Sequence, residues 1–458
     1  MKASYKSIFR ILFFGVSMSV LLCFPLKMMC QDVQQTESRL LKQAGENIEK
    51  YRKGDVTVSF KTLDGKVIRN ARVEIHQRTH DFMFGCIIFD LIHHENNYRE
   101  GLFKERFKNL FNLAVFPFYW PGYESRQGFT RWEDMLQTID WCKANGITTK
   151  GHPLVWATES GTPPWLTGYS VKETEELLKT RVLNITAGFR DEIELFDVVN
   201  EPIHVKTWKH KMQAFNDKND WGVTDTLSLI ADYVEQALKW AHQGNPRATL
   251  LINEYETLAN KDARKRYDDL LAELKKRNAP LGGLGIQAHE PRQEWFSPEE
   301  VWKTFDQLSR FGYPIHITEF HPQSSGVPIT GGWRTGNWTP EAQAEFTEQF
   351  VTLCFGHPAV ASVNWWGLSD RNIWLPGGGL VDEEYRPKPV YVMLDKLINH
   401  TWKTDMAVQT DNQGVISFRG FFGEYEISLT SPDGRVRVFP VHVSKSEENK
   451  WAFVIDGY

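Results

Sequence analysis

The sequence predicts an α/β protein, a closed (β/α)8 barrel with a small accessory β-sandwich, and three observations support this fold. Between about residues 80 and 400, eight short apolar runs alternate with helical segments, a pattern typical of a closed parallel barrel rather than an open sheet. Alternation of apolar and polar residues, typical of strands, appears on both sides of this region. The length of 458 residues fits a barrel of about 250 residues plus an accessory module.

Composition excludes several classes of protein. Apolar residues make up 41% and charged residues 24%, which is ordinary globular usage and excludes long disorder and a polytopic membrane protein. The net charge is 53 − 58 = −5, so the chain carries no broad electrostatic surface for nucleic acid. The 17 Trp, 14 Tyr and 29 Phe are a surplus that indicates either flat ring surfaces in a binding cleft or an aromatic-rich core.

The N-terminus has the features of an export signal over residues 1–30. An apolar run at 11–25 follows three basic residues (Lys2, Lys6 and Arg10). The run is shorter than the roughly 20 residues that span a bilayer, so we expect cleavage near residue 31 and no membrane association afterwards. The expected location is secreted or periplasmic. A surface lipoprotein is less favoured, because the stretches before Cys23 and Cys30 lack small residues.

Three cysteines remain after the predicted signal: Cys86, Cys142 and Cys354. Their wide separation is neither a disulfide scaffold nor the spacing of a zinc site. We expect each to be a buried small apolar residue.

The rest of the chain divides into three predicted parts. Residues 31–53 have helical spacing and predict a lead-in helix. The alternation at 56–60 and 71–75, on either side of an Asp-Gly turn at 64–65, predicts a β-hairpin. Short strands are predicted near the C-terminus at 415–419, 425–429, 436–438 and 441–443. Neither end can bury a core alone, so residues 54–80 and 403–458 are predicted to form one sandwich. We interpret it as a structural brace, with a carbohydrate-binding unit as the alternative.

The barrel is predicted to occupy residues 81–402. Its expected strands are 82–86, 113–116, 148–150, 195–199, 249–253, 284–288, 316–319 and 362–366. Its expected helices include 134–145, 171–189, 225–243, 262–277, 298–311 and 340–355. No Gly-rich phosphate loop interrupts this alternation.

Two glutamates occupy the positions where such barrels carry their chemistry, the C-terminal ends of strands. The fourth strand ends in Asn200-Glu201, and the seventh ends in Glu319. Either residue alone could be a salt-bridged strand end. Together, across an aromatic barrel mouth, they suit acetal hydrolysis, in which one carboxyl donates a proton and the other attacks or activates water. The ionised partner raises the pKa of the other carboxyl, and neither a metal nor a cofactor is expected.

Seven motifs in order then resemble the family 10 glycoside hydrolases, best known as endo-1,4-β-xylanases. They are GHPLVW (151–156), FDVVNEP (196–202), LLINEYE (250–256), GLGIQAH (283–289), HITEF (316–320), NWWGLSDRNIW (364–374) and RPKP (386–389). The resemblance implies a retaining barrel glycosidase in which Glu201 is the acid/base and Glu319 the nucleophile.

The same resemblance implies substrate contacts. Asn200 would bond the 2-hydroxyl of the cleaved sugar, and Gln287 and His289 would position the nucleophile. Trp366 would form the floor of the central subsite, and His152 would line it, although both histidines also fit buried core positions. Further substrate-binding candidates are Tyr119, Trp120, Tyr255, Trp374 and Trp338, the last in a Gly-rich loop (331–338) predicted to form a cleft wall.

The chain departs from the family pattern beside these motifs. Phe116 and Tyr119 stand where the family usually carries an Asn and a Lys after the second strand, and Ala157 replaces the second His of its GHxLVWH motif. Because a site that loses polar partners and gains rings changes which sugars it accepts, we expect altered specificity.

The sequence therefore predicts an exported, monomeric retaining β-glycosidase that binds a polysaccharide or oligosaccharide, a β-1,4-xylan or a decorated relative. Two alternatives stay open. One is a glycan-binding degenerate barrel without turnover, and the other is a retaining glycosidase for a different β-glycan.

Overall fold

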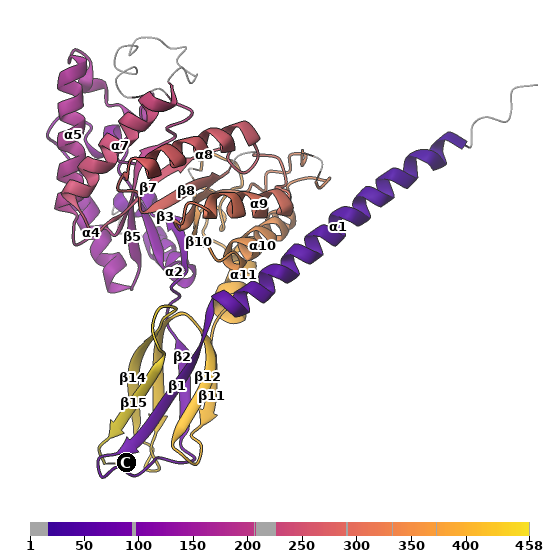
Figure 1. The fold of residues 1–458 in the computed structure, drawn as a ribbon, viewed down its shortest axis with the longest axis vertical. Helices are drawn as coiled ribbons and strands as arrows, with labels where there is room; N and C mark the ends of the chain where they lie inside the picture. The colour runs from indigo at the N-terminus through magenta and orange to yellow at the C-terminus, as the bar shows by residue number, and fades with distance from the viewer. Residues whose placement is uncertain are drawn as a thin grey trace, which may run out of the picture.

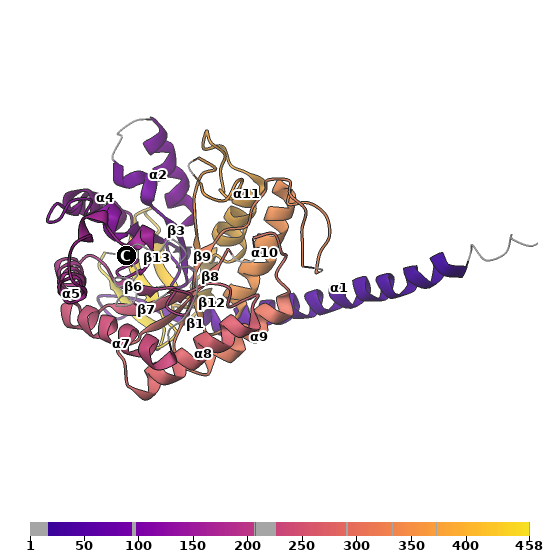
Figure 2. The ribbon, with the colours of Figure 1, turned by 90° about the horizontal axis from the view of Figure 1, so that it is seen from above.

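The computed structural model describes residues 17–93, 98–205, 207, 226–289, 292–331, 333–371 and 373–457. It confirms the predicted fold. Eight parallel strands close into a barrel in sequence order, with the last strand paired to the first, and helices surround them (Figures 1 and 2). The strands are β3 (Met83–Ile87), β4 (Leu113–Pro117), β5 (Thr148–His152), β6 (Leu195–Asn200), β7 (Thr249–Glu254), β8 (Gly283–Ala288), β9 (Ile315–Phe320) and β10 (Val360–Trp365).

The outer helices agree with the predicted ranges to within a few residues. They are α4 (Trp132–Ala144), α5 (Val171–Gly188), α7 (Leu227–Gly244), α8 (Lys261–Lys276), α9 (Pro298–Ser309) and α10 (Pro340–Gly356). Five of these six helices, all except α4, have an N-cap side chain that accepts a hydrogen bond from the first turn, such as the capping box of Ser170 and Glu173 on α5. The structure adds α2 (Tyr98–Leu110) and α11 (Pro389–Lys396), which fill the remaining places in the ring.

The two ends of the chain meet in the predicted β-sandwich below the barrel (Figure 1). One sheet has the order β12-β1-β15, and the other has the order β11-β2-β13-β14. The sandwich strands are β1 (Lys53–Thr62), β2 (Arg72–Gln77), β11 (Asp405–Gln409), β12 (Val415–Phe421), β13 (Gly423–Thr430), β14 (Val436–Val443) and β15 (Lys450–Ile455). Apolar side chains of both sheets share one buried cluster, for example Val58, Phe60, Ile75 and Ile427.

Two details of the sandwich prediction were wrong. The segments at 56–60 and 71–75 do not form a hairpin, because β1 pairs with β12 and β15 while β2 pairs with β11 and β13. A short turn follows β1, in which the backbone N–H of Thr62 donates to the carbonyl of Lys66 at 2.8 Å and that of Ile68 donates to the carbonyl of Phe60 at 3.1 Å. The chain then crosses from one sheet to the other. The segments at 436–438 and 441–443 are halves of one continuous strand, β14.

The predicted lead-in helix exists and is longer than expected. Helix α1 (Ser17–Tyr51) begins inside the predicted signal and extends away from the body as a rod (Figures 1 and 2). Its last turns pack on α10, where Leu40, Ala44 and Ile48 are buried. In the described part of the chain, no helix combines the length and apolarity that crossing a bilayer requires.

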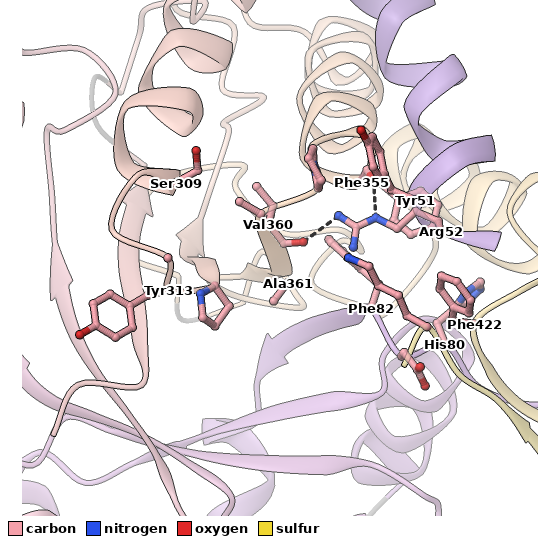
Figure 3. A pocket seen from close by; sticks show the side chains of 16 residues that line it. Tyr51, Arg52, His80, Phe82, Ser309, Tyr313, Phe355, Val360, Ala361 and Phe422 are labelled. Atoms are coloured by element: carbon pink, nitrogen blue, oxygen red, sulfur yellow. Dashed lines mark hydrogen bonds between the residues drawn. The ribbon is translucent and has the colours of Figure 1, made fainter. Parts of the chain in front are cut away.

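A cavity of about 500 Å³ lies where α1, the barrel and the sandwich meet (Figure 3). Arg52 lies at its edge and donates hydrogen bonds to the carbonyl oxygens of Phe355 (2.6 Å), His357 (2.7 Å) and Val360 (2.7 Å). Because these residues end α10 and begin β10, the cavity is at the N-terminal end of the barrel, opposite the predicted site.

The three cysteines after the predicted signal are free and buried, as expected: Cys86, Cys142 and Cys354.

Candidate active site

The C-terminal ends of β6 to β9 bring the two predicted glutamates to the same end of the barrel. Glu201 follows the last residue of β6, and Glu319 lies in β9 beside Gln287 of β8. Glu201 has a φ of +56°, in the left-handed region that non-glycine residues seldom occupy. Its backbone N–H donates to the carbonyl of Asn253 at 2.7 Å, so the strained turn is held by the neighbouring strand β7.

Glu201 accepts two side-chain hydrogen bonds. The indole N–H of Trp156 donates to Oε2 at 2.9 Å, and Nε2 of Gln287 donates to Oε1 at 3.0 Å. Nε2 of His289 lies 2.9 Å from Oε1 of Gln287 and therefore donates to it. The resemblance implied that Gln287 would position the nucleophile. That expectation was wrong, because the amide of Gln287 bonds the acid/base candidate Glu201 instead.

Glu319 is held mainly by Asn253. The Nδ2 group of Asn253 donates to Oε1 of Glu319 at 2.6 Å and to Oδ1 of Asn200 at 2.8 Å. Nε2 of His289 lies 3.6 Å from Oε2 of Glu319, and Nε2 of His152 lies 3.8 Å from Oε1. The hydrogen bond from Asn253 occupies the side-chain oxygen of Asn200. The side-chain NH2 group of Asn200 is therefore the part that can donate to a sugar hydroxyl.

Both carboxyl groups have raised pKa values. Burial raises the pKa of Glu201 to about 7, and the charge of Glu254 adds to this. Burial also raises the pKa of Glu319 well above its usual range, with a further contribution from the charge of Glu201. Because each ionised group opposes ionisation of the other, the pair retains a proton near neutral pH.

A buried ion pair supports the site from below. Nζ of Lys150 and Nδ1 of His152 each lie 2.7 Å from Oδ2 of Asp197, and all three side chains are at most 1% exposed. Burial alone would raise the pKa of Asp197, but the charge of Lys150 and the hydrogen bond with His152 outweigh it and lower that pKa. Burial lowers the pKa of His152, so its ring stays neutral. The pair fixes the ring that lines the site, as expected for His152.

Aromatic side chains form one wall of the site. Trp366 meets the ring of His152 edge-on at 5.0 Å between centroids. Tyr119 meets His152 at 5.4 Å and Trp156 at 5.8 Å. Phe89 lies edge-on to both Tyr119 and Trp366. Burial raises the pKa of Tyr119 well above its usual range, so its phenol stays protonated beside the two glutamates. The structure therefore places Trp366 and Tyr119 around His152, and Tyr119 lies near both glutamates; their contact with substrate stays a prediction.

Two further candidates lie at the rim. Trp374 is 47% exposed, meets His289 edge-on at 5.1 Å, and lies 4.4 Å from the guanidinium of Arg292. Tyr255 follows β7 and stacks on His204 with 3.9 Å between centroids. An exposed ring such as Trp374 offers a flat apolar face to a sugar.

Two predicted substrate-binding residues, Trp338 and Trp120, lie neither in the aromatic wall nor at the rim of the site. Trp338 is 1% exposed, stacks on Trp295 at 5.5 Å and donates its indole N–H to the carbonyl of Gln293. The predicted cleft wall at Trp338 was wrong, because that ring is part of the packed core beside α10. Trp120 is also buried, and its indole N–H donates to Glu124 at 2.8 Å.

Sequence reasoning missed four residues that hold the site. Asn253, Asp197 and Lys150 lie within strands, and Trp156 is the last residue of the motif GHPLVW. The sequence contained a signal for them, because a charged or amide side chain inside a fully buried strand must find a partner.

Among the described residues, no group of three or more His, Cys, Asp or Glu side chains is placed to hold a metal ion. The arrangement therefore offers two coupled carboxyls, several fixed amide donors and an aromatic wall.

Comparison with known proteins finds xylanases among the curated relatives of this chain. "Endo-1,4-beta-xylanase 2" of Arabidopsis thaliana is 27% identical over 394 residues, which cover 84% of this chain and 33% of that protein. "Endo-1,4-beta-xylanase B" of Thermotoga neapolitana is 26% identical over 295 residues, which cover 62% of this chain and 79% of that protein. The chain thus spans about a third of the length of the Arabidopsis relative.

A solved structure and a family model extend the comparison. The crystal structure of xylanase 10B from Thermotoga petrophila RKU-1 in complex with xylobiose superposes with a TM-score of 0.57 at 21% identity. The superposition covers 70% of this chain and 95% of that one, and it supports the barrel fold. The model described as "Glycosyl hydrolase family 10" matches residues 78–396, which include the whole barrel and both glutamates. The chain therefore belongs to glycosyl hydrolase family 10.

Proposed function

We propose that this chain is an exported retaining β-glycosidase that hydrolyses a β-1,4-xylan or a decorated relative. One observation carries the proposal. At the barrel mouth a buried glutamate, Glu319, and a half-buried one, Glu201, share one amide network, in which Asn253 bonds Glu319 and Gln287 bonds Glu201. The family match and the xylanase names of the relatives support the substrate class.

The mechanism assigns one step to each carboxyl. Glu319 attacks the anomeric carbon while Glu201 gives its proton to the departing glycosidic oxygen, which leaves a glycosyl ester on Glu319. Glu201, now ionised, takes a proton from the water that cleaves this ester. The pKa of Glu201, raised to about 7 by burial, keeps it protonated for the first step.

Ionisation of Glu319 depends on whether Glu201 holds its proton. While Glu201 is protonated it carries no charge, so it does not oppose ionisation of Glu319. The amide of Asn253 and the charge of Lys150 then favour the carboxylate form of Glu319 and so counter part of the burial effect on its pKa. Once the ester forms, Glu319 is neutral and Glu201 can ionise, so the pair exchanges roles as double displacement requires.

A retaining glycosidase for a different β-glycan is the second candidate, and Tyr119 favours it. This ring stands among His152, Trp156 and Phe89, where the family pattern has a polar side chain. An aromatic wall favours an apolar or methylated sugar face over the free hydroxyl groups of an unsubstituted xylan.

The test is hydrolysis of xylan, decorated xylans, β-glucan, galactan and mannan, with products identified by mass spectrometry. We expect wild-type protein to release oligosaccharides of retained β configuration, seen by NMR of the first product. Glu319→Ala is expected to abolish release, with Glu105→Ala on the surface as the matched control. Binding of a glycan by calorimetry without any release by the wild type would instead establish a non-catalytic barrel.

Export is part of the proposal and is supported by Lys2, Lys6 and Arg10 before the apolar run at 11–25. N-terminal sequencing of protein collected outside the cytoplasm is expected to begin near residue 31.

A further inference from the structure

The turn that carries Glu201 is anchored to the end of β7 by one carboxylate. The backbone N–H groups of His204 and Val205 donate to the carbonyl of Glu201, both at 3.1 Å, which closes the turn. Glu254 accepts a hydrogen bond from the backbone N–H of Ile203 at 2.9 Å and lies 2.6 Å from Nδ1 of His204. The position of the acid/base candidate therefore depends on Glu254 and His204.

Glu254 needs a positive partner. Its side chain is fully buried, and a buried carboxylate is costly without a nearby counter-charge. Nδ1 of His204 faces Glu254, while Nε2 of the same ring lies 3.8 Å from Oε2 of Glu256. A carboxylate near each ring nitrogen, one within hydrogen-bond distance and one within ion-pair distance, favours the positively charged imidazolium form of histidine.

The ring of His204 is also fixed in its plane. It stacks on Tyr255 with 3.9 Å between centroids and 26° between planes, an arrangement that suits a cation over an aromatic face. Tyr255 in turn donates its backbone N–H to Glu254 at 2.9 Å. His204, Glu254 and Tyr255 thus form one rigid unit beside Glu201.

We propose that His204 is a positively charged positioning residue for the general acid, which holds the turn of Glu201 against Glu254 and offsets the charge of Glu254 at the catalytic centre. This inference rests on the proposed glycosidase function. His204 acts through Glu201 and does not itself touch the reacting atoms.

The charges around Glu201 fix the sign of the expected effects. Among the described residues, Glu201 faces Glu319 of β9, Glu254 of β7, Tyr119 after β4 and His204 of its own turn. Burial raises the pKa of Glu201, the charge of Glu254 raises it further, and the charge of His204 lowers it. Removing the charge of His204 should raise this pKa, whereas removing that of Glu254 should lower it.

The experiment measures the alkaline limb of kcat/KM against pH, which reports ionisation of the general acid in the free enzyme. His204→Gln keeps a hydrogen-bond donor but loses the charge, and we expect the limb to move up by about 0.5 pH unit or more. Glu254→Gln keeps the shape of the side chain, and we expect the limb to move down by about the same amount. His204→Lys keeps the charge and is expected to keep the limb near its wild-type position.

The matched control is His400→Gln, because His400 is an exposed histidine that also lies near a carboxylate, 3.9 Å from Asp395, and is outside the site. A merely structural role of His204 would lower kcat without moving the limb. An unmoved limb, or a shift of the same sign in His204→Gln and Glu254→Gln, overturns the proposal. If Glu254→Gln does not fold, the contrast between Gln and Lys at position 204 decides. Absence of activity in the wild type would overturn the proposed function instead.

Discussion

The side-chain amide of Asn253 donates to Oε1 of Glu319 at 2.6 Å and to Oδ1 of Asn200 at 2.8 Å. One residue of β7 therefore ties the nucleophile candidate of β9 to the expected sugar-binding residue of β6. The oxygen of the same amide accepts from the hydroxyl of Thr318, which prevents the amide from flipping. The geometry of the site is thus set by strands, the most rigid elements of the barrel.

Replacing Asn253 with Ala is expected to lower kcat/KM about a hundredfold, the usual cost of losing one fixed donor to a reacting oxygen. The carboxylate form of Glu319 loses its shortest hydrogen bond, so its pKa should rise and the acid limb of the pH profile should move upward. Asn109→Ala, on the outer helix α2, is the control. An unchanged acid limb in Asn253→Ala would contradict this assignment.

The raised pKa of Glu201 predicts a pH-dependent stability. Burial raises this pKa from 4.5 to about 7, so the folded protein holds the proton more tightly than the unfolded chain does. The stabilising contribution is complete below about pH 4.5 and is lost as the pH rises through about 7. Glu201→Gln is therefore expected to raise the free energy of unfolding at pH 8 by up to about 3 kcal/mol and to change it little at pH 4.

Denaturant unfolding of both proteins at the two pH values checks this expectation. Glu105→Gln, in which an exposed carboxylate is replaced, should give the same unfolding free energy as wild type at each pH. A stabilisation by Glu201→Gln that is equal at pH 4 and pH 8 would show that burial of the charge is not its cause.

The strands of the barrel could be predicted because strands covered on both faces read as continuous apolar runs. The two glutamates could be predicted because each comes at the end of such a run. Asn253 escaped notice for a related reason. It also comes at the end of an apolar run, but its partner lies two strands away around the barrel, and register between strands is not visible in the sequence.

The errors in the sandwich and in the cleft wall have one physical origin, which is contact between distant segments. An Asp-Gly turn between two alternating segments normally indicates a hairpin, but β1 pairs instead with β12 and β15 from the other end of the chain. A Trp in a Gly-rich loop normally indicates exposure, yet Trp295 of another loop covers Trp338.

Substitution of two tryptophans should distinguish a residue that binds substrate from a residue that packs in the core. Trp374 is 47% exposed, so Trp374→Ala is expected to raise KM for an oligosaccharide about tenfold, with little change in kcat or in unfolding free energy. Trp338 is 1% exposed, so Trp338→Ala is expected to cost about 3–5 kcal/mol of stability, as large core truncations do. Steady-state kinetics and chemical denaturation of both variants test the contrast. A higher KM with wild-type stability in Trp338→Ala would restore the predicted cleft wall.

Helix α1 is expected to be part of the folded protein rather than a passive leader. Glu37 is 6% exposed and accepts two hydrogen bonds from Arg334, at 2.7 and 2.8 Å, and one from Gln349. Because Glu37→Ala leaves the half-buried guanidinium of Arg334 without this carboxylate, we expect it to lower the free energy of unfolding by about 2–4 kcal/mol. Glu46→Ala, on an exposed face of the same helix, should cost less than about 0.5 kcal/mol.

Removal of whole segments extends this test. A chain that begins at residue 32 keeps Glu37, Leu40, Ala44 and Ile48, and we expect it to unfold at the same denaturant concentration as the full chain. A chain that begins at residue 53 loses all of these contacts and exposes the surface of α10, where Ala44 packs directly on Gly356. We expect this shorter chain to be strongly destabilised or insoluble. Equal stability of the two chains would show that α1 contributes nothing to the barrel, whatever its contacts.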